Sequence, residues 1–344
     1  MKTDDFDYEL EDWRIAQHPE EKRDHSKLLI MDRMTGEITH DLFYHLDQYL
    51  NQGDVLVMND TRVLPARLFG HRPEKEESIE VLLLVEKEKD LWECLVRPGK
   101  KMKNNQKIIF GEGQLRGQVE GITEDGSRMI RFQYDGIFQE RLEELGTMPL
   151  PPYITEKLED QERYQTVYSK INGSAAAPTA GLHFTEGLLD KLAHKGIQQA
   201  FITLHVGLGT FRPVQVDDVK KHKMHSEWYH IGEESCRKIV EAKKKNKKII
   251  AVGTTTMRTL ETVSRNHGGK LVPETGWTDI FIYPGFEFNI VDELITNFHL
   301  PKSTLLMLIS AFSSREKVLH AYEVAKKKDY RFFSFGDAML LRKD

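Results

Sequence analysis

The stretch IIAVGTTTMRTLETVSR, residues 249–265, places an apolar run, a threonine-rich segment and a helix-like segment directly one after another. Ile249–Val252 predicts a buried strand, and we expect a helix from about Met257 to Arg265 with the threonines between them as a turn. A strand followed by a helix is the repeating unit of a layered α/β fold. The stretch therefore predicts helices packed on a sheet.

Further strands and helices are predicted on both sides of this stretch. Thr185 can cap a helix whose Leu188, Leu189 and Leu192 share one face and which ends near Gly196. Ser313 and Glu316 have the spacing of a capping box, in which each side chain bonds to the other's backbone N–H. The remaining predictions are strands over 200–206 and 279–283, the second stopping at Pro284-Gly285, and helices over 235–245, 303–312 and 316–327.

Between Ser78 and Tyr134 the pattern changes to short strands separated by turn-forming residues. Asp125-Gly126 is the clearest turn, because Gly accepts the positive φ of a tight hairpin. Strands at this spacing are typical of a small antiparallel barrel or sandwich. The segment 148–153 contains three prolines, which do not fit a helix or a central strand, and it predicts a linker. The predicted strands cover 79–85, 91–96, 107–110, 114–119 and 129–134.

The first sixty residues also carry strand and helix signals and end in the apolar run Val55–Met58. We therefore predict a discontinuous α/β core domain, residues 1–62 and 154–344. It is interrupted by an inserted small antiparallel β-barrel domain, residues 63–153. A chain of 344 residues has the length of about two domains.

Composition favours a soluble protein of the cytoplasm. Charged side chains make up 30% of the chain and the net charge is −5, which excludes a globally basic nucleic-acid coat protein. Two cysteines, Cys94 and Cys236, exclude a disulfide framework and fit a reducing compartment. The acidic first residues do not resemble a secretory signal, and the most apolar run, 305–312, is too short to cross a bilayer.

Five polar segments at the ends of predicted elements are candidates for a site. Taken alone, residues 59–62 are equally compatible with an ordinary turn, whereas a capped loop is the default for 175–185 and a core histidine is favoured for 204–211. Ligands of open α/β sheets collect beyond the carboxyl ends of strands, so five such segments in one domain indicate an active site. No GxGxxG, GxxxxGK[ST] or HExxH motif occurs. The segments are NDTR (59–62), AAAPTAGLHFT (175–185), LHVGLGTF (204–211), GTTTMR (253–258) and NFHLPKS (297–303).

Basic residues cluster in two places. Residues 220–248 contain ten Lys or Arg against four Glu. Such clusters either neutralise the phosphates of a nucleic acid or form solvated helix faces. The insert contributes the second cluster, which consists of Arg97, Lys100, Lys101, Lys103 and Lys107.

Three histidines, His222, His225 and His230, raise the question of a metal site. The first two are spaced to share one helical face. No carboxylate or Cys pattern completes a site, and neighbouring lysines crowd it with positive charge, so we expect no metal.

Longer stretches carry a family likeness across nearly the whole chain. They are 53–67, 148–153, 163–168, 175–185, 203–213, 278–285, 296–303 and 330–340, and 175–185 is the most specific. On these residues the chain resembles the S-adenosylmethionine:tRNA ribosyltransferase-isomerase family of queuosine biosynthesis. Two departures are visible: Glu11-Asp12 replaces the family's usual Leu-Pro, and Thr256-Met257 lies where members vary.

The resemblance implies a reaction, a fold and a set of partners. The ribosyl part of S-adenosylmethionine passes to 7-aminomethyl-7-deazaguanine at the wobble position of tRNA. It rearranges to give epoxyqueuosine, with release of adenine and methionine. The implied fold is an α/β domain bearing an inserted β-barrel. No metal is implied, and no cofactor beyond S-adenosylmethionine as donor. The partners would be the modified tRNA and S-adenosylmethionine, with no membrane, and we expect a monomer.

The chemistry can be matched to residue types. The sulfonium acidifies the adjacent 5′ carbon, so a base can start the rearrangement, and departing adenine needs a proton. The candidate acids and bases are His183, His205, His299 and Asp60. The methionine carboxylate would bind Arg258 with Thr254 and Thr255, or Arg62, and the sulfonium would rest against Tyr283 or Phe298.

Motif membership completes the candidate site. The substrate-binding candidates are Asn59, Thr61, Arg62, Pro178, Thr179, Gly207, Gly209, Thr210, Thr254, Thr255, Arg258, Tyr283, Asn297, Phe298 and Lys302. The tRNA-binding candidates are Lys100, Lys101, Lys103, Lys243, Lys244, Lys245, Lys247 and Lys248. Two other classes stay open from the residues alone, a non-catalytic RNA-binding protein and a metal-dependent hydrolase.

Overall fold

The computed structural model describes residues 1–124, 126–207, 214 and 216–343. The chain divides into two compact units. The larger unit comprises Met1–Arg62, Pro152–Ile171 and Ala177–Asp344, and the smaller comprises Val63–Pro151 and Asn172–Ala176. No helix among the described residues is long and apolar enough to cross a membrane.

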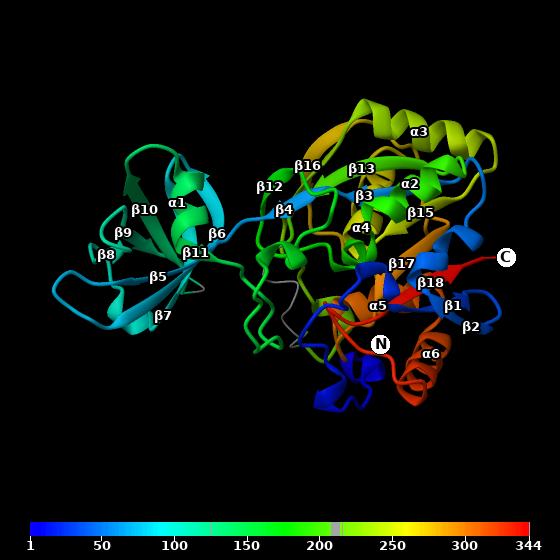
Figure 1. Cartoon of the computed structure of the whole chain (residues 1–344), viewed down its shortest axis with the longest axis horizontal. Helices are drawn as coiled ribbons and strands as arrows, with labels where there is room; N and C mark the ends of the chain where they lie inside the picture. The colour runs from blue at the N-terminus through cyan, green and yellow to red at the C-terminus, as the bar shows by residue number, and fades with distance from the viewer. Residues whose placement is uncertain (125, 208–213, 215, 344) are drawn as a thin grey trace. The chain divides into compact units, whose positions relative to one another are not determined.

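The smaller unit is built around the antiparallel barrel that the sequence predicts (Figure 1). Six strands follow one another in the order β5-β6-β7-β10-β9-β8, and the pairing of β8 with β5 closes the ring. Closure leaves none of the six with an unpaired edge. The strands are β5 (Arg67–His71), β6 (Ser78–Glu88), β7 (Leu91–Arg97), β8 (Lys107–Phe110), β9 (Leu115–Ile122) and β10 (Arg128–Tyr134), joined by β11 (Gly146–Thr147) on β5 and by helix α1 (Phe138–Leu145).

The larger unit contains a mixed sheet of nine strands in the order β16-β14-β13-β3-β15-β17-β18-β1-β2. Its centre is parallel, because β13, β3, β15 and β17 all run in one direction. The strands are β1 (Lys27–Asp32), β2 (Ile38–Leu42), β3 (Val55–Asn59), β13 (Gln198–Leu204), β14 (Glu227–Ile231), β15 (Ile249–Val252), β16 (Glu274–Thr278), β17 (Glu293–Asn297) and β18 (Ala338–Arg342). A separate pair is formed by β4 (Thr61–Val63) and β12 (Ile171–Ser174).

Helices cover this sheet (Figure 1), and the apolar side chains of its central strands are buried. The leucines of α2 pack in one cluster with Leu56 and Met58 of β3 and Ile250 and Val252 of β15. Thr185 caps α2 as predicted, since its hydroxyl accepts the Leu188 N–H at 3.1 Å. The helices are α2 (Glu186–His194), α3 (Glu233–Lys244), α4 (Thr254–Asn266), α5 (Thr304–Phe312) and α6 (Arg315–Lys327).

The predicted threonine-rich turn after β15 is wrong, because α4 already begins at Thr254. Gly253 has a φ of +87° and turns the chain directly from strand to helix. The Thr256 hydroxyl then donates to the Val252 carbonyl at 2.8 Å, and the Thr259 hydroxyl to the Thr255 carbonyl at 3.0 Å. Threonine hydroxyls that bond back one turn are compatible with a helix.

Three other local predictions are wrong for identifiable reasons. The strand expected over 279–283 is absent; β16 ends at Thr278, whose hydroxyl accepts the Ile280 N–H at 3.2 Å. Ser314, not Ser313, caps α6, because the Ser313 hydroxyl donates to the Arg33 carbonyl. The helical face expected for His222 and His225 is absent, since the 3₁₀ helix before them ends at Lys221. The predicted turn residue Asp125 lies outside the described residues.

A buried carboxylate fastens α4 to the segment that leads into β17. Glu261 accepts the backbone N–H groups of Asn289, Ile290 and Val291 at 2.9, 3.0 and 2.9 Å. Its side chain is fully buried, and burial raises the pKa of this carboxyl even though the three hydrogen bonds oppose the shift. The clamp fixes where β17 enters the sheet.

Replacing Glu261 with Gln tests this clamp. The amide keeps one acceptor oxygen but turns an NH₂ donor toward backbone N–H groups. We expect the free energy of unfolding to fall by about 2–4 kcal/mol, measured by urea unfolding. Glu241→Gln, on the exposed face of α3, is the matched control and should change it by less than about 0.5 kcal/mol. Equal effects of the two substitutions would contradict the clamp.

Candidate active site

Three polar segments of the larger unit meet at one edge of the sheet. The strands β3, β15 and β17 run parallel, so their carboxyl ends lie at the same edge. They end at Asn59, at Val252 before Gly253, and at Asn297. These ends belong to three separate motifs in the sequence, and the sheet brings them together.

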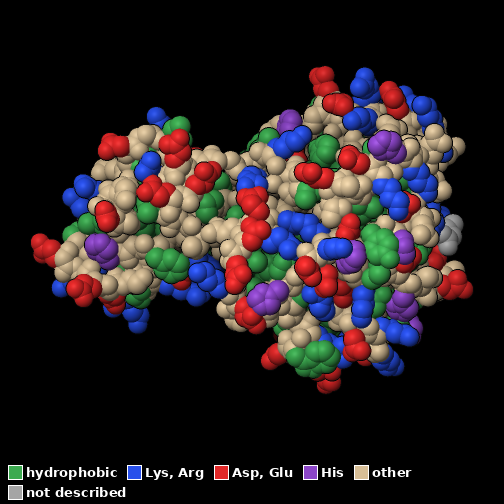
Figure 2. Space-filling model, viewed as in Figure 1, with side chains coloured by type: hydrophobic (Ala, Val, Ile, Leu, Met, Phe, Trp, Pro, Cys, Tyr) green, Lys and Arg blue, Asp and Glu red, His purple; other side chains and the backbone are tan. Residues whose placement is uncertain are grey.

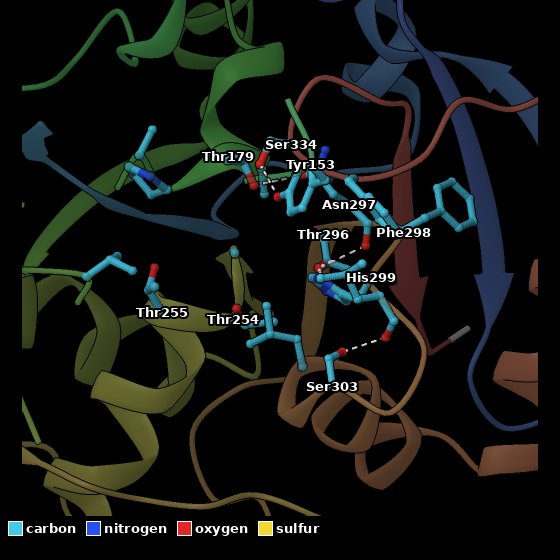
Figure 3. A pocket seen from close by; sticks show the side chains of 18 residues that line it. Tyr153, Thr179, Thr254, Thr255, Thr296, Asn297, Phe298, His299, Ser303 and Ser334 are labelled. Atoms are coloured by element: carbon cyan, nitrogen blue, oxygen red, sulfur yellow. Dashed lines mark hydrogen bonds between the residues drawn. The ribbon is translucent and has the colours of Figure 1, made fainter. Parts of the chain in front are cut away.

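A pocket with about 670 Å³ of open space lies at this edge. Figure 3 shows Thr254 and Thr255 of α4 on one side and Thr179, Tyr153 and Asn297 on another. None of the described residues that line it is Asp, Glu, Lys or Arg. The lining consists of Tyr153, 177–180, Val206, 253–255, 296–300, Ser303, Leu305, Phe333 and Ser334.

Asn59 holds the strand ends in place behind this pocket. Its side chain is fully buried. The amide nitrogen donates to the Leu204 carbonyl at 3.0 Å and to the Thr255 hydroxyl at 3.2 Å. The amide oxygen accepts the N–H groups of Leu204 and Thr61 at 3.0 and 3.2 Å. Asn59, which the sequence predicts as a substrate-binding residue, therefore ties β3, the end of β13 and the start of α4 together.

His299 is the one of the three predicted catalytic histidines that lines the pocket among the described residues. Its Nε2 lies 2.7 Å from the Thr296 hydroxyl, with which it shares a hydrogen bond. Its backbone is held by two tyrosines: the His299 N–H donates to the Tyr322 hydroxyl at 2.8 Å, and the Tyr8 hydroxyl donates to the His299 carbonyl. Two backbone bonds and one side-chain bond fix the imidazole at the pocket wall (Figure 3).

His183 does not line the pocket but contacts a residue that does. Its Nε2 is 3.1 Å from the Asn297 amide nitrogen, and its Nδ1 is 2.7 Å from the Ser26 hydroxyl. Asn297 lines the pocket, and its amide oxygen accepts the Thr179 hydroxyl at 3.0 Å. His183 is thus placed to orient Asn297 and, through it, Thr179.

All three histidines are neutral at neutral pH. Burial lowers the pKa of His299 to about 3 and that of His205 to about 4. Burial, followed by the charges of Arg331 and Arg23, lowers the pKa of His183 to about 3. Removing an imidazolium from water is costly, so the uncharged form dominates. A neutral imidazole offers a lone pair to a proton donor, and a pKa this low makes it a weak base.

His205 and Asp60 lie near the same strand ends but do not line the pocket. The Nδ1 of His205 is 2.8 Å from the Thr61 hydroxyl, and its ring stacks on Trp228 at 4.8 Å between centroids. Asp60 accepts the Thr203 hydroxyl at 2.6 Å. Burial raises the pKa of the Asp60 carboxyl above its usual value.

The two arginines expected to bind a carboxylate both have acidic partners in the protein. Arg258 is buried and forms an ion pair with Glu227, whose other oxygen accepts the Gly207 N–H at 2.9 Å. Arg62 donates to Glu162, at 3.2 Å from Nη1 to Oε2, and to the Ser169 hydroxyl. The structure therefore leaves the first turn of α4, rather than a guanidinium, facing the pocket.

The side chains of three further predicted substrate-binding residues pack or pair elsewhere in the protein. The Phe298 ring is buried among Tyr322, Tyr330 and Phe332, at 5.1, 5.6 and 4.9 Å between centroids. Tyr283 packs on Phe281, and Lys302 pairs with Asp4 and Asp7 at 2.9 and 3.0 Å. Pro178, Thr179, Thr254, Thr255 and Asn297 do line the pocket, whereas Gly209 and Thr210 lie outside the described residues.

Sequence reasoning missed several residues of the pocket wall. Tyr153 belongs to the predicted linker, yet its hydroxyl shares a 2.7 Å hydrogen bond with Ser334 and its ring packs on Phe333 at 5.0 Å. Thr296 and Ser303 also line the pocket. These five residues lie in stretches that carry the family likeness, which was the signal available for finding them. They are Tyr153, Thr296, Ser303, Phe333 and Ser334.

The predicted tRNA-binding lysines differ in availability. Lys243 lies 3.6 Å from Asp292, Lys248 lies 2.5 Å from Glu293, and Lys101 pairs with Glu77. Lys244 and Lys245 are exposed without an ion pair among the described residues, as are Lys100 and Lys103. The segment 243–248 precedes β15 and so lies at the sheet edge opposite the pocket. On the face in Figure 2, basic side chains are interspersed with acidic ones. Lys247 packs against Gly53.

Among the described residues no group of three or more His, Cys, Asp or Glu side chains could hold a metal ion. His222 packs on Phe281, and the Nδ1 of His230 shares a hydrogen bond of 2.6 Å with the Thr275 hydroxyl. These side chains do not converge on a common point.

Comparison with known proteins identifies the family. The family described as "Queuosine biosynthesis protein" matches residues 3–341. Proteins called S-adenosylmethionine:tRNA ribosyltransferase-isomerase are similar over nearly their whole length. That of Finegoldia magna is 67% identical over 341 residues, 99% of this chain and 98% of its own. That of Acetivibrio thermocellus is 57% identical over 342 residues, which are 99% of this chain and 100% of its own. A crystal structure of S-adenosylmethionine tRNA ribosyltransferase from Thermotoga maritima is 41% identical, covers 98% of this chain and 99% of its own, and superposes with a TM-score of 0.56. The resemblance seen in the sequence is confirmed, and the chain belongs to the queuosine biosynthesis protein family.

Proposed function

We propose that this protein transfers the ribosyl group of S-adenosylmethionine to 7-aminomethyl-7-deazaguanine in the wobble position of tRNA. The ribosyl group is isomerised so that epoxyqueuosine, adenine and methionine result. The observation that carries the proposal is the 67% identity over 99% of the chain to a protein named for this transfer and isomerisation. The pocket supports it, because its neutrality and its position at the strand ends suit a small substrate.

The start of α4 is the place in this pocket for the methionine carboxylate. The helix has thirteen residues, and its N-cap Gly253 contributes no side chain to the free N–H groups of the first turn. Those groups and the positive end of the helix dipole favour an anion. The Thr254 and Thr255 side chains line the pocket beside them. A neutral pocket with one anion-binding end would orient S-adenosylmethionine along it.

The histidines divide into two roles. His299 lines the pocket and is neutral, so it is our candidate for the base that takes the proton from the 5′ carbon. His183 bonds Asn297 and is a positioning residue. Asp60 is the candidate for protonating the departing adenine, because a carboxyl with a raised pKa retains its proton more readily. His205, at the adjoining strand end, is an acid–base candidate by position only.

We also propose the arrangement that the sequence predicts: an α/β domain of residues 1–62 and 154–344, interrupted by a β-barrel domain inserted at 63–153. The compact smaller unit, with its own closed barrel, supports this division. The protein would act as a monomer in the cytoplasm, where its tRNA substrate resides. It would need no cofactor beyond S-adenosylmethionine as ribosyl donor.

The test of the reaction is the release of free adenine. Purified protein is incubated with S-adenosylmethionine and tRNA carrying the aminomethyl base, and adenine is quantified by chromatography. We expect one adenine per modified nucleotide and none with tRNA that lacks the base. Binding of tRNA without any adenine release would contradict the proposal and favour a non-catalytic RNA-binding protein.

Single substitutions of His183, His205 and His299 by Ala test the acid–base roles. Loss of a true acid or base should lower turnover about a hundredfold or more. Turnover and the affinity for S-adenosylmethionine are measured separately, because a positioning residue is expected to change both. Wild-type rates in all three variants would contradict the histidine mechanism.

The pH profile distinguishes a neutral base from an ordinary histidine. A base with a pKa of about 3 stays unprotonated from pH 8 down to pH 6, so turnover limited by His299 should not fall over that interval. An acidic limb near pH 6.5 that disappears in His299→Gln would contradict a buried neutral imidazole.

Charge reversal tests the lysine clusters. Lys244→Glu with Lys245→Glu, or Lys100→Glu with Lys103→Glu, should reduce the salt slope of tRNA binding by about one for each phosphate that is no longer neutralised. The affinity for S-adenosylmethionine should stay unchanged. Lys327→Glu, exposed on α6, is the control. A slope equal to that of the control would assign the lysines to a solvated surface.

A further inference from the structure

Three arginines from separate segments of the larger unit surround a recess with about 260 Å³ of open space. Arg23 belongs to the 3₁₀ helix η3 (Arg23–His25), and Arg163 to the 3₁₀ helix η6 (Gln161–Tyr164). Arg331 lies between α6 and β18. All three are half-buried. The proposed reaction uses none of them.

Neutral carbonyl groups hold the first two guanidiniums in place. Arg23 donates to the Leu182 and Glu162 carbonyls at 3.3 and 2.8 Å. Arg163 donates to the Glu20 and Glu21 carbonyls. A carbonyl fixes the direction of a guanidinium but leaves its positive charge in place. The two side chains are therefore oriented and still fully charged.

Carboxylates in this region are directed to Arg331. Its Nη2 lies 2.7 Å from Glu20 and 3.8 Å from Asp337. Among the described residues, neither Arg23 nor Arg163 has a carboxylate within ion-pair distance, and the Glu162 carboxylate is bound to Arg62. The Nε of Arg163 is buried and has no hydrogen-bond acceptor. Burial, and next the charge of Arg163, lower the pKa of Arg23, and the more distant carboxylates of Asp160 and Glu162 only partly oppose this shift.

The recess adjoins the reaction pocket. Ser334 lines both. His183 also lines the recess, and its Nε2 bonds Asn297, which lines the pocket. An anion bound in the recess would thus lie one side chain away from a group held in the pocket.

We infer that Arg23 and Arg163 bind a backbone phosphate of the tRNA strand next to the nucleotide whose base enters the pocket. Planar guanidiniums match the several oxygens of a phosphodiester and form strong charge-assisted hydrogen bonds with it. The inference rests on the proposed function, because a nucleic-acid substrate supplies phosphates at short intervals along the strand. The methionine carboxylate has the same oxyanion chemistry, and it is the other source that the test must separate.

The test compares Arg163→Gln, Arg163→Lys and Arg23→Gln with Arg265→Gln, an exposed arginine at the end of α4. The affinity for tRNA carrying the aminomethyl base is measured over a range of salt concentrations, and that for S-adenosylmethionine separately. Arg163→Gln and Arg23→Gln should each raise the Kd for tRNA about tenfold and lower the salt slope by about one. Arg163→Lys should keep the slope but bind more weakly than wild type, since it loses the planar fork.

The control and the affinity for S-adenosylmethionine should stay at wild-type values. A tRNA affinity and salt slope unchanged in both Gln variants would overturn the phosphate site, as would a loss of S-adenosylmethionine binding with tRNA binding intact. If the wild-type protein binds tRNA and releases adenine while the Gln variants bind tRNA normally, only the phosphate site is contradicted. Wild-type protein that does neither would remove the proposed function. Thermal unfolding identifies a variant that fails to fold. In that case the tRNA affinity of Arg163→Lys, which keeps the charge, tests the phosphate site.

Discussion

The site depends on the amide of Asn59, which no water can replace because it is fully buried. One side chain satisfies both the N–H and the carbonyl of Leu204 and also reaches the Thr255 hydroxyl. These bonds fix the spacing between the end of β13, the end of β3 and the first turn of α4. An unpaired buried polar group costs about 1–3 kcal/mol, so the arrangement is strongly favoured over any in which one strand end slips. The positions of the pocket-lining residues in these three elements are therefore fixed relative to one another.

Electrostatics in the larger unit separates a neutral pocket from charged surroundings. The pocket wall contains no charged side chain among the described residues, and its histidine is held uncharged by burial. Cations nearby are either paired with carboxylates, as Arg258 is with Glu227, or face the neighbouring recess. A neutral pocket leaves the field of the α4 N-terminus without a counter-charge from the described lining residues.

Much of the fold could be predicted because local patterns and tertiary packing agree. The leucine face of α2, the apolar run of β15 and the short strands of the barrel are examples. Prediction failed where a tertiary interaction decided the outcome. The Ser313 hydroxyl bonds to the Arg33 carbonyl instead of capping a helix, and the Thr278 hydroxyl ends β16 before the expected strand.

The candidate site could be predicted only in part. Motif positions such as Thr254, Asn297 and His299 do meet in one pocket. The pairing of Arg258 with Glu227 could not be foreseen, because nothing in the sequence marks two residues thirty-one positions apart as partners. Tyr153 was hidden in a proline-rich stretch whose composition indicates only the absence of regular structure. Side-chain partners across a sheet edge are set by the fold, and a single sequence does not contain them explicitly.

The strand order has a consequence for how the protein is made. β18, residues Ala338–Arg342, lies between β1 and β17, so the interior of the sheet is completed by the strand that comes after its eight other strands in the sequence. Until that strand leaves the ribosome, β1 and β17 each present an unpaired, apolar edge of buried residues. Exposed edges of this kind invite pairing with other chains. A nascent chain would therefore expose both edges until β18 has been synthesised, and dependence on chaperones during translation is the expected consequence of this topology.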